Sequence, residues 1–268
     1  MRSPHAASWC VLPAPDPVSS DTGIPEPASL DLNAGAVEVL FGDRAPLATR
    51  FAEHLSTSAV ERGLIGPREV PRIWDRHILN CAAIHPLIAE GVTVADVGSG
   101  AGLPGIAVAI ARPDLHVTLV EPLQRRVLWA EEVVDDLGLH NVVVTRARAE
   151  EVVGRLAVQV VTARAVAALP QLCRWCLPLL EPGGELLAVK GRSAHEEAQA
   201  AAGELRALGA SSWSVSLCGE GLLEVPTTVV KVTRGAAGPA GRSGGPRAGR
   251  SPGDGRVGRR HGGRSGRA

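Results

Sequence analysis

The chain has 268 residues, of which 45% are hydrophobic, and its 28 Lys and Arg side chains balance its 28 Asp and Glu side chains. This length and apolar content allow a sizeable core in one large domain or two small ones, and the composition is typical of a soluble globular protein. No apolar run approaches the roughly 18 residues that a membrane-spanning helix needs, so we expect no membrane partner and a cytoplasmic location.

The two ends of the chain differ in composition from the rest. Residues 1–30 contain six prolines and no continuous apolar core, which predicts a flexible leader and not a secretory signal. Residues 235–268 contain eight Arg, twelve Gly and one Asp, so this tail carries about +7 and the chain before it about −7. Such a tail cannot bury a core, and we expect it to be disordered. It either binds RNA phosphates through its arginines or is a solvated extension.

Stretches with apolar residues at helical spacing precede the core. They lie at residues 32–42 and 45–63, and a third helical stretch follows at 71–81. Together they predict an N-terminal helical cap over residues 31–90. The cofactor-binding core is then expected to run from residue 91 to residue 234.

The stretch 71–81 carries side chains that suit a functional site. It places His77 near one face and Arg72 and Arg76 near another. A single His in such a helix is more often structural than catalytic. The two arginines and Trp74 fit either an exposed face or a contact with nucleic acid.

The centre of the sequence is a strand, a glycine turn and a helix. Residues 92–97 have the pattern of a strand, residues 105–111 that of a buried helix, and the turn contains Gly98, Gly100 and Gly102. Glycine adopts positive φ angles without strain and lets a ligand approach the backbone. We therefore predict a site for a nucleotide-like cofactor at the carboxyl end of this strand.

Two acidic residues near the turn bear on the identity of the cofactor. The G-x-G-x-x-G spacing from Gly100 to Gly105, with Glu121 downstream, matches the dinucleotide fingerprint, so a nicotinamide or flavin cofactor is one alternative. A glycine turn in a ligand-free α/β protein is another. Asp96, two residues before Gly98, favours S-adenosylmethionine because the arrangement resembles motif I of class I methyltransferases. There Asp96 would hold the methionine end, directly or through water, and Glu121 would accept both ribose hydroxyls.

Strands and helices alternate over the rest of the core, which predicts a parallel sheet with helices on both faces. The last two strands are close enough in sequence to pair antiparallel. Six parallel strands and a reversed seventh make up the Rossmann-like, seven-stranded sheet of class I methyltransferases, so the predicted fold class is α/β. Further strands are expected at 116–121, 141–145, 158–163, 185–190, 212–218 and 227–233, and helices at 122–137, 169–180 and 193–208.

Four residues follow strands at the edge where open α/β sheets bind their ligands. Ala149 and Glu150 come after the third strand, where backbone groups of a methyltransferase read the edge of the adenine. Arg164 and Lys190 come at the ends of the fourth and fifth strands. We expect all four to lie near the cofactor.

Cys173 and Cys176 have the spacing of a redox or zinc motif, but no second pair completes a four-ligand site. They lie in a predicted helix, where residues three apart share one face. Buried, reduced thiols are therefore favoured over a redox or metal site, and we expect no metal ion.

Five segments form a set of motifs, namely WDRHILN at 74–80, DVGSGAGLPGI at 96–106, VEP at 120–122 followed by Arg125 and Arg126, Arg164 with Ala165, and Lys190 with Gly191. Over residues 32–232 this set resembles the RsmG (GidB) family of bacterial small-subunit ribosomal-RNA guanine-N7 methyltransferases. The resemblance implies a class I methyltransferase fold, S-adenosylmethionine as cofactor and 16S ribosomal RNA, in the small ribosomal subunit, as substrate. It also implies cofactor contacts at Gly98, Leu103, Ala149, Glu150 and Arg164.

The chemistry of guanine N7 determines what the residues of such an enzyme must do. N7 carries a free in-plane lone pair, so methyl transfer needs no general base, and the protein has to align N7 with the methyl group. Arg164, Lys190 and His77 would position the guanine and its phosphates, and the enzyme is expected to be a monomer.

An alternative is a non-catalytic ribosome-assembly or RNA-binding factor that retains the fold. Arg125 and Arg126 fit either RNA contact or a solvated helix face.

Overall fold

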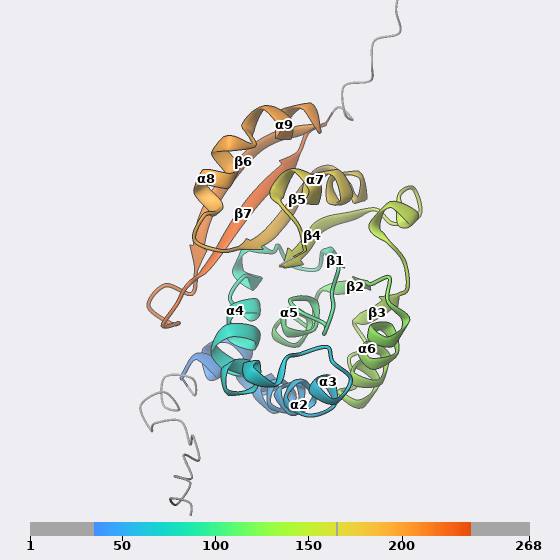
Figure 1. Ribbon diagram of the computed structural model, residues 1–268, viewed down its shortest axis with the longest axis vertical. Coiled ribbons are helices and arrows are strands. Elements are labelled where there is room, and N and C mark those ends of the chain that lie inside the picture. The colour runs from blue at the N-terminus through green and yellow to red at the C-terminus, as the bar shows by residue number, and fades with distance from the viewer. Residues whose placement is uncertain (1–34, 165, 237–268) are drawn as a thin grey trace, which may run out of the picture.

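One seven-stranded sheet forms the centre of the computed structural model, which describes residues 35–164 and 166–236 (Figure 1). Its strands are β1 (Thr93–Val97), β2 (His116–Val120), β3 (Val142–Thr145), β4 (Val158–Arg164), β5 (Leu180–Lys190), β6 (Ala210–Cys218) and β7 (Thr227–Arg234). Their order across the sheet is β3-β2-β1-β4-β5-β7-β6. The first five strands pair in parallel, and β7 is antiparallel to both of its neighbours, β5 and β6. Six strands therefore share one direction, which confirms the predicted class I methyltransferase sheet.

The helices fall into two groups that pack on opposite faces of the sheet (Figure 1). The first group comprises α2 (Ala45–Ser56), α3 (Ser58–Glu61), α4 (Leu79–Ala82), α5 (Gly105–Ala111) and α6 (Gln124–Asp136). The second group comprises α7 (Leu169–Cys176), α8 (Ala194–Ala200) and α9 (Ala202–Ala207). Residues 35–41 are helical as well and pack with the first group.

Adjacent residues of the central strands pack into different cores. Val94 of β1 and Val160 of β4 contribute to the core under the cap, whereas their neighbours Ala95 and Val161 contribute to the core under α7, α8 and α9. This alternation follows from the twofold side-chain period of a strand. The cap helices share their core with α5 and α6, so the cap is packed directly onto the sheet layer that carries the glycine turn.

The cap differs from the prediction because two of its expected helices are interrupted. The helix expected at 45–63 breaks at Thr57, whose hydroxyl donates to the Glu53 carbonyl, a local bond that competes with regular helix geometry. The helix expected at 71–81 is a 3₁₀ turn (Pro67–Arg72), a π turn (Ile73–Ile78) and then α4. Pro71 lies inside the 3₁₀ turn, and because it lacks an N–H group a regular α-helix cannot extend back through this turn.

Two later helices are also shorter than expected. The helix predicted at 169–180 ends at Cys176 and continues as a 3₁₀ turn (Leu177–Leu179) around Pro178, and β5 already begins at Leu180. The helix predicted at 193–208 is divided into α8 and α9. The predicted order of elements is otherwise confirmed.

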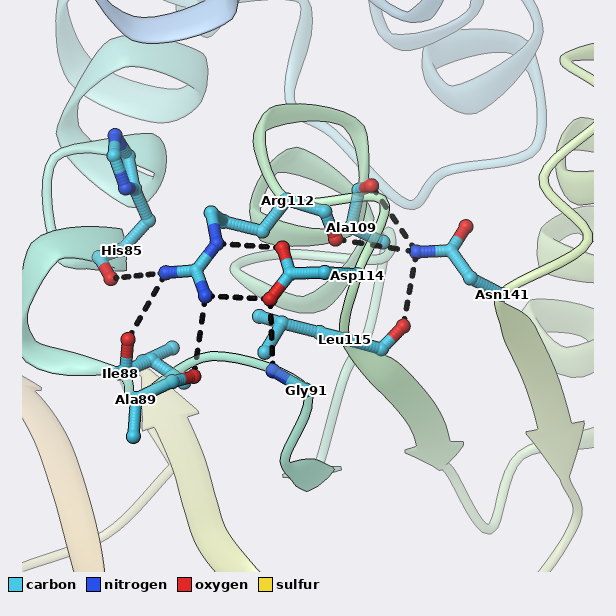
Figure 2. Close-up of polar contacts among 9 residues, drawn as sticks. All are labelled: His85, Ile88, Ala89, Gly91, Ala109, Arg112, Asp114, Leu115 and Asn141. Atoms are coloured by element: carbon cyan, nitrogen blue, oxygen red, sulfur yellow. Dashed lines mark hydrogen bonds and ion pairs between the residues drawn. The ribbon is translucent and has the colours of Figure 1, made fainter.

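A polar network joins the end of the cap to the loop between α5 and β2 (Figure 2). The Arg112 guanidinium donates to the carbonyls of His85, Ile88 and Ala89 at 3.3, 2.9 and 3.1 Å. It also forms an ion pair of 2.6 Å with Asp114, which holds the pKa of that carboxyl well below its usual range. Arg112 thus satisfies backbone acceptors that would otherwise lie unpaired in the loop. The Asn141 amide donates in the same way to three further carbonyls, those of Ala109, Arg112 and Leu115.

Arg112→Ala should destabilise the fold by about 2–4 kcal/mol, because it removes a largely buried charged donor from three carbonyls and one carboxylate. The free energy of unfolding in urea measures this change. The matched control is Arg50→Ala, which removes a half-exposed guanidinium from Asp136 and should cost no more than about 1 kcal/mol. A similar small loss in both variants would contradict the bracing role of Arg112.

Parts of the predicted organisation lie outside the described residues. These are the whole leader (1–30), residues 31–34 at the start of the expected cap, Ala165 and the tail from residue 237 onward. Within the described part of the chain, no helix has the length and apolar character needed to cross a membrane.

Candidate functional site

A cavity of about 610 Å³ opens where β1, β2, β3 and β4 end. Its wall joins the cap, the glycine turn and the loops that follow three of these strands. By segment, the lining consists of residues 64–65 and His77, residues 97–101 and Leu103, residues 120–123 and Arg126, residues 147–150, and Arg164, Val166 and Trp175. The site therefore lies at the carboxyl edge of the sheet, as the sequence predicts.

The predicted glycines of the turn have two different environments. Gly98, Gly100 and Gly102 all have positive φ angles, of 70°, 58° and 73°. Gly98 and Gly100 line the cavity, whereas Gly102 does not. A Cβ atom at Gly102 would lie 2.3 Å from the Cδ1 atom of Ile106, so this glycine is required for packing against α5. Of the three glycines, the first two therefore form part of the cavity wall, and the third serves the packing of the turn against α5.

Asp96 lies behind the turn and not in the cavity wall. Its side chain is fully buried, and its two carboxyl oxygens accept hydrogen bonds from the Gly105 N–H at 2.9 Å and the Thr162 hydroxyl at 3.1 Å. Burial raises the pKa of Asp96 to about 7, because the charged form loses its hydration. In this geometry Asp96 ties the end of β1 to the start of α5 and thereby holds the turn in place.

Asp96→Asn should make stability less dependent on pH. The pKa of Asp96 is about 7 in the folded protein and near 4 in the unfolded chain. Its contribution to stability is therefore complete below pH 4, decreases as the pH rises, and is lost above pH 7. Asn cannot ionise, yet its amide can accept from Gly105 and donate to Thr162. We expect this carboxyl to lower the wild-type free energy of unfolding by about 2–3 kcal/mol between pH 5 and pH 8. Urea unfolding should show that Asp96→Asn lacks this decrease in the free energy of unfolding. Equal pH dependence in both proteins would contradict the raised pKa of Asp96.

Glu121, directly after β2, is 2% exposed and lines the cavity. One carboxylate oxygen accepts from the Gly100 N–H and the other from the Leu123 N–H, both at 3.0 Å. Arg126 approaches the first oxygen at 3.5 Å. The carboxylate is thus held in one orientation by the turn on one side and its own loop on the other. Each ionised carboxylate oxygen can accept two hydrogen bonds, so the oxygen bound to Leu123 keeps one free lone pair. Release of the long 3.5 Å contact with Arg126 would free a second lone pair on the other oxygen.

Ala149 and Glu150 reach the cavity from a 3₁₀ turn (Ala149–Val152) that follows β3. Ala149 is buried and the Glu150 side chain is exposed. Backbone N–H groups at the start of a helical turn have no partner inside it, so they remain available to a ligand. This geometry suits a backbone role for both residues.

Arg164 at the end of β4 and His77 of the cap are in contact within the cavity wall. The Arg164 Nη1 atom lies 2.8 Å from the Cys81 sulfur, and Nη2 donates to the Arg76 carbonyl at 2.9 Å and to the His77 Nδ1 atom at 3.2 Å. The His77 Nε2 atom lies 2.9 Å from a carboxylate oxygen of Glu69. Burial and the Arg164 charge lower the pKa of His77, while Glu69 opposes this shift.

Lys190 does not line the cavity. Its ammonium group donates to the Ala167 carbonyl at 2.8 Å and to Glu197 at 2.9 Å. The same Glu197 oxygen accepts from the Leu169 N–H at 2.6 Å. Lys190 therefore braces the segment between β4 and α7, next to the cavity wall.

Ser99 is a site residue that the sequence analysis did not single out. It lines the cavity at 1% exposure, and its hydroxyl has no hydrogen-bond partner among the described residues. A buried polar group without a partner is costly unless a ligand satisfies it. Its place between Gly98 and Gly100 is a signal that could have identified it. Trp175 on α7 gave no such signal, because only the packing of α7 beside the turn after β3 brings it to the cavity.

The two cysteines with motif spacing are buried and free. Burial raises the pKa of Cys173 to about 12 and that of Cys176 well above its usual range, which describes unreactive thiols. Across residues 35–164 and 166–236, no three His, Cys, Asp or Glu side chains gather where a metal ion could bind.

Comparison with known proteins identifies the family. The model of the GidB family, described as rRNA small subunit methyltransferase G, matches residues 44–225. A protein named ribosomal RNA small subunit methyltransferase G from Arthrobacter sp. (strain FB24) is 62% identical over 197 residues, covering 74% of this chain and 91% of the relative. Its namesake from Streptomyces coelicolor is 56% identical over 73% of this chain and 82% of the relative, and that from Rhodococcus jostii is 54% identical over 78% and 92%. On this basis, the chain belongs to the GidB family of rRNA small subunit methyltransferase G proteins.

Proposed function

We propose that this protein transfers a methyl group from S-adenosylmethionine to N7 of a guanine in 16S ribosomal RNA. We further propose that it acts in the cytoplasm, as a monomer, on the small ribosomal subunit. The observation that carries the proposal is the placement of Glu121 against Gly100 in the wall of the cavity. The names of the relatives, which refer to the RNA of the small subunit, support the substrate class.

The residues of the cavity fit the proposed cofactor. The Glu121 carboxylate suits the two ribose hydroxyls, and the backbone of Ala149 and Glu150 suits the adenine edge. Gly98, Gly100 and Leu103 leave the turn accessible. The Ser99 hydroxyl, which has no partner among the described residues, offers a hydrogen bond next to them. S-adenosylmethionine supplies an electrophilic methyl group on a sulfonium centre. Asp96 and Gly102 contribute by shaping the turn.

The chain has to orient the guanine and does not need to move a proton, because N7 already carries its lone pair. Arg164 is one of three arginines in the cavity wall, with Arg126 and Arg148, and it can donate to the guanine O6 or to a phosphate. His77 holds Arg164, and Lys190 supports the adjacent segment through Ala167. Arg125 and Arg126, at the start of α6, are proposed to contact RNA phosphates.

Two measurements test this function. Calorimetric titration with S-adenosylmethionine should show saturable binding, whereas an RNA-binding factor that merely retains the fold would show none. Incubation with labelled S-adenosylmethionine and small subunits that lack the modification should place label in 7-methylguanosine after nuclease digestion. Label in another nucleoside, or cofactor binding without transfer to any RNA, would contradict the proposal.

Removal of the Gly/Arg tail tests whether it contributes to RNA binding. The tail carries eight Arg and one Asp. Truncation after Arg234 should leave cofactor affinity and folding unchanged but weaken RNA binding, most strongly at low salt. The slope of log affinity against log salt should flatten by up to about 0.7 for each phosphate of single-stranded RNA that the arginines of the tail neutralise in the full chain. Equal affinity and slope in both proteins would show that the tail is a solvated extension.

A further inference from the structure

Three hydrogen-bonded polar side chains, the Glu69–His77–Arg164 triad, connect the cap to the cavity. Glu69 comes from the 3₁₀ turn Pro67–Arg72, His77 from the π turn Ile73–Ile78, and Arg164 from the end of β4. Within this triad, the His77 Nε2 atom lies 2.9 Å from a Glu69 carboxylate oxygen, and the His77 Nδ1 atom lies 3.2 Å from the Arg164 Nη2 atom. His77 and Arg164 both line the cavity, although 87 positions separate them in the sequence.

The hydrogen-bond donors and acceptors of the triad allow only one placement of the imidazole proton of His77. A guanidinium has only donors, so the His77 Nδ1 atom must accept with its lone pair. A neutral imidazole then carries its proton on Nε2, where it donates to Glu69. Glu69 thereby selects the tautomer that can hold Arg164. A protonated His77 would carry a proton on both nitrogens and would point an N–H group at the guanidinium.

The surroundings of His77 favour the neutral form. The charged groups that face it are Glu69, Arg76 and Arg164, and Arg76 is itself paired with Glu69 at 3.3 Å. Burial is the largest influence and lowers the pKa of His77, and both arginines lower it further, against the opposing effect of Glu69. The His77 side chain is only 12% exposed, so solvent does not replace these partners.

The hydrogen bonds of Arg164 fix the position of its guanidinium. Cys81, the Arg76 carbonyl and His77 take up three of its five N–H groups. All three partners belong to residues 76–81 of the cap, so the position of this cation depends on the cap. The other two N–H groups have no partner among the described residues and remain for a ligand.

We propose that Glu69 is a positioning residue, which acts through the neutral tautomer of His77 to hold the Arg164 guanidinium in the cavity wall. Protonation of His77 breaks this contact, so at acidic pH Arg164 is held only by Cys81 and the Arg76 carbonyl and is less well ordered. The inference rests on the proposed function for its effect on activity, but the tautomer and the contact with Arg164 do not depend on it.

Four variants separate positioning from packing. His77→Asn keeps a side-chain oxygen near the place of Nδ1 but cannot be protonated in this pH range, whereas His77→Ala removes the acceptor. Glu69→Gln keeps an acceptor without the charge, whereas Glu69→Ala removes both. The matched control is Glu61→Ala, since Glu61 is an exposed acidic residue of the cap that does not line the cavity.

Two readouts need no catalysis. Nitrogen NMR of the imidazole, assigned by comparison with His77→Asn, should show the Nε2–H tautomer at pH 7.5; an Nδ1–H tautomer or an imidazolium would overturn the proposal. The lowered pKa means that the His77 contribution to stability is complete above about pH 6.5 and is lost as the pH falls through the folded pKa. Asp96 shifts the stability of both proteins alike, so the wild type should lose stability relative to His77→Asn as the pH falls from 7 to 5. A difference between the two proteins that stays constant over this range would also overturn the proposal.

The third readout is the pH profile of kcat/KM for methyl transfer. His77→Ala should lower the plateau about tenfold or more, the effect of losing one charged hydrogen bond, and His77→Asn should recover most of it and lack the acid limb. The kcat/KM of Glu69→Gln should stay within about threefold of the wild-type value, with its acid limb at lower pH. The kcat/KM of Glu69→Ala should fall toward that of His77→Ala. Glu61→Ala should match the wild type. An unchanged acid limb in His77→Asn would contradict the proposal. If the wild type transfers no methyl group, the proposed function fails, while the first two readouts still decide the role of His77.

Discussion

Glu121→Ala should weaken S-adenosylmethionine binding by about 100-fold or more, because it removes two charge-assisted hydrogen bonds of roughly 1.5–3 kcal/mol each. The carboxylate is 2% exposed and is held by the Gly100 and Leu123 N–H groups. A ligand that binds this fixed group does not have to order it first. Calorimetric titration of the cofactor measures the change in dissociation constant.

Glu150→Ala is the matched control for this prediction. Glu150 also lines the cavity, but its side chain is exposed and its proposed role is carried by the backbone. It should change affinity less than about threefold. Glu121→Gln, which keeps one oxygen acceptor for the backbone, shows whether the loss in Glu121→Ala comes from ligand contacts or from a displaced turn. Equal losses in Glu121→Ala and Glu150→Ala would contradict the assignment of the two loops.

Gly98→Val and Gly100→Val should abolish measurable cofactor binding. Both positions have positive φ angles, which a β-branched residue adopts only at a cost of about 1–3 kcal/mol. A Cβ atom at Gly98 would lie 3.0 Å from the Cγ2 atom of Val166. A Cβ atom at Gly100 would have the Gly98 carbonyl oxygen, at 3.8 Å, as its nearest contact beyond the adjacent residues. A valine at either position therefore places methyl groups in or against the wall that the ligand must approach.

Backbone strain has to be separated from obstruction of the site, and Gly138 provides the control. It has a φ angle of 62°, and a Cβ atom there would meet nothing within 4 Å. Gly138→Val should lose stability like the other two variants but bind the cofactor normally. Wild-type affinity in a folded Gly98→Val or Gly100→Val protein would remove the glycine turn from the site.

The sequence was sufficient to predict the sheet and the turn, because both depend on local patterns. Alternating apolar stretches indicated the strands, and the glycines before residue 105 indicated a turn with positive φ angles. Glu121 could be placed in the cavity because it directly follows a strand of the parallel sheet. The same argument brought Arg164 to the cavity wall.

The roles of Asp96 and Lys190 could not be predicted in this way. Both come from the correct edge of the sheet, but their partners decide where the side chains lie. Asp96 is held by Thr162 on the neighbouring strand β4, and Lys190 by Glu197 on α8. Glu69 carried no signal at all, since its contact with His77 depends on the 3₁₀ and π turns that replace the expected helix.

The central claim is tested most directly in 16S ribosomal RNA from a strain that lacks the gene for this protein. The RNA should miss a single N7-methylguanine, mapped by mass spectrometry of nuclease fragments. Expression of the wild-type chain should restore that modification, and expression of Glu121→Ala at the same level should not. An unchanged modification pattern in the deletion strain, or restoration by Glu121→Ala as complete as by the wild type, would contradict the account.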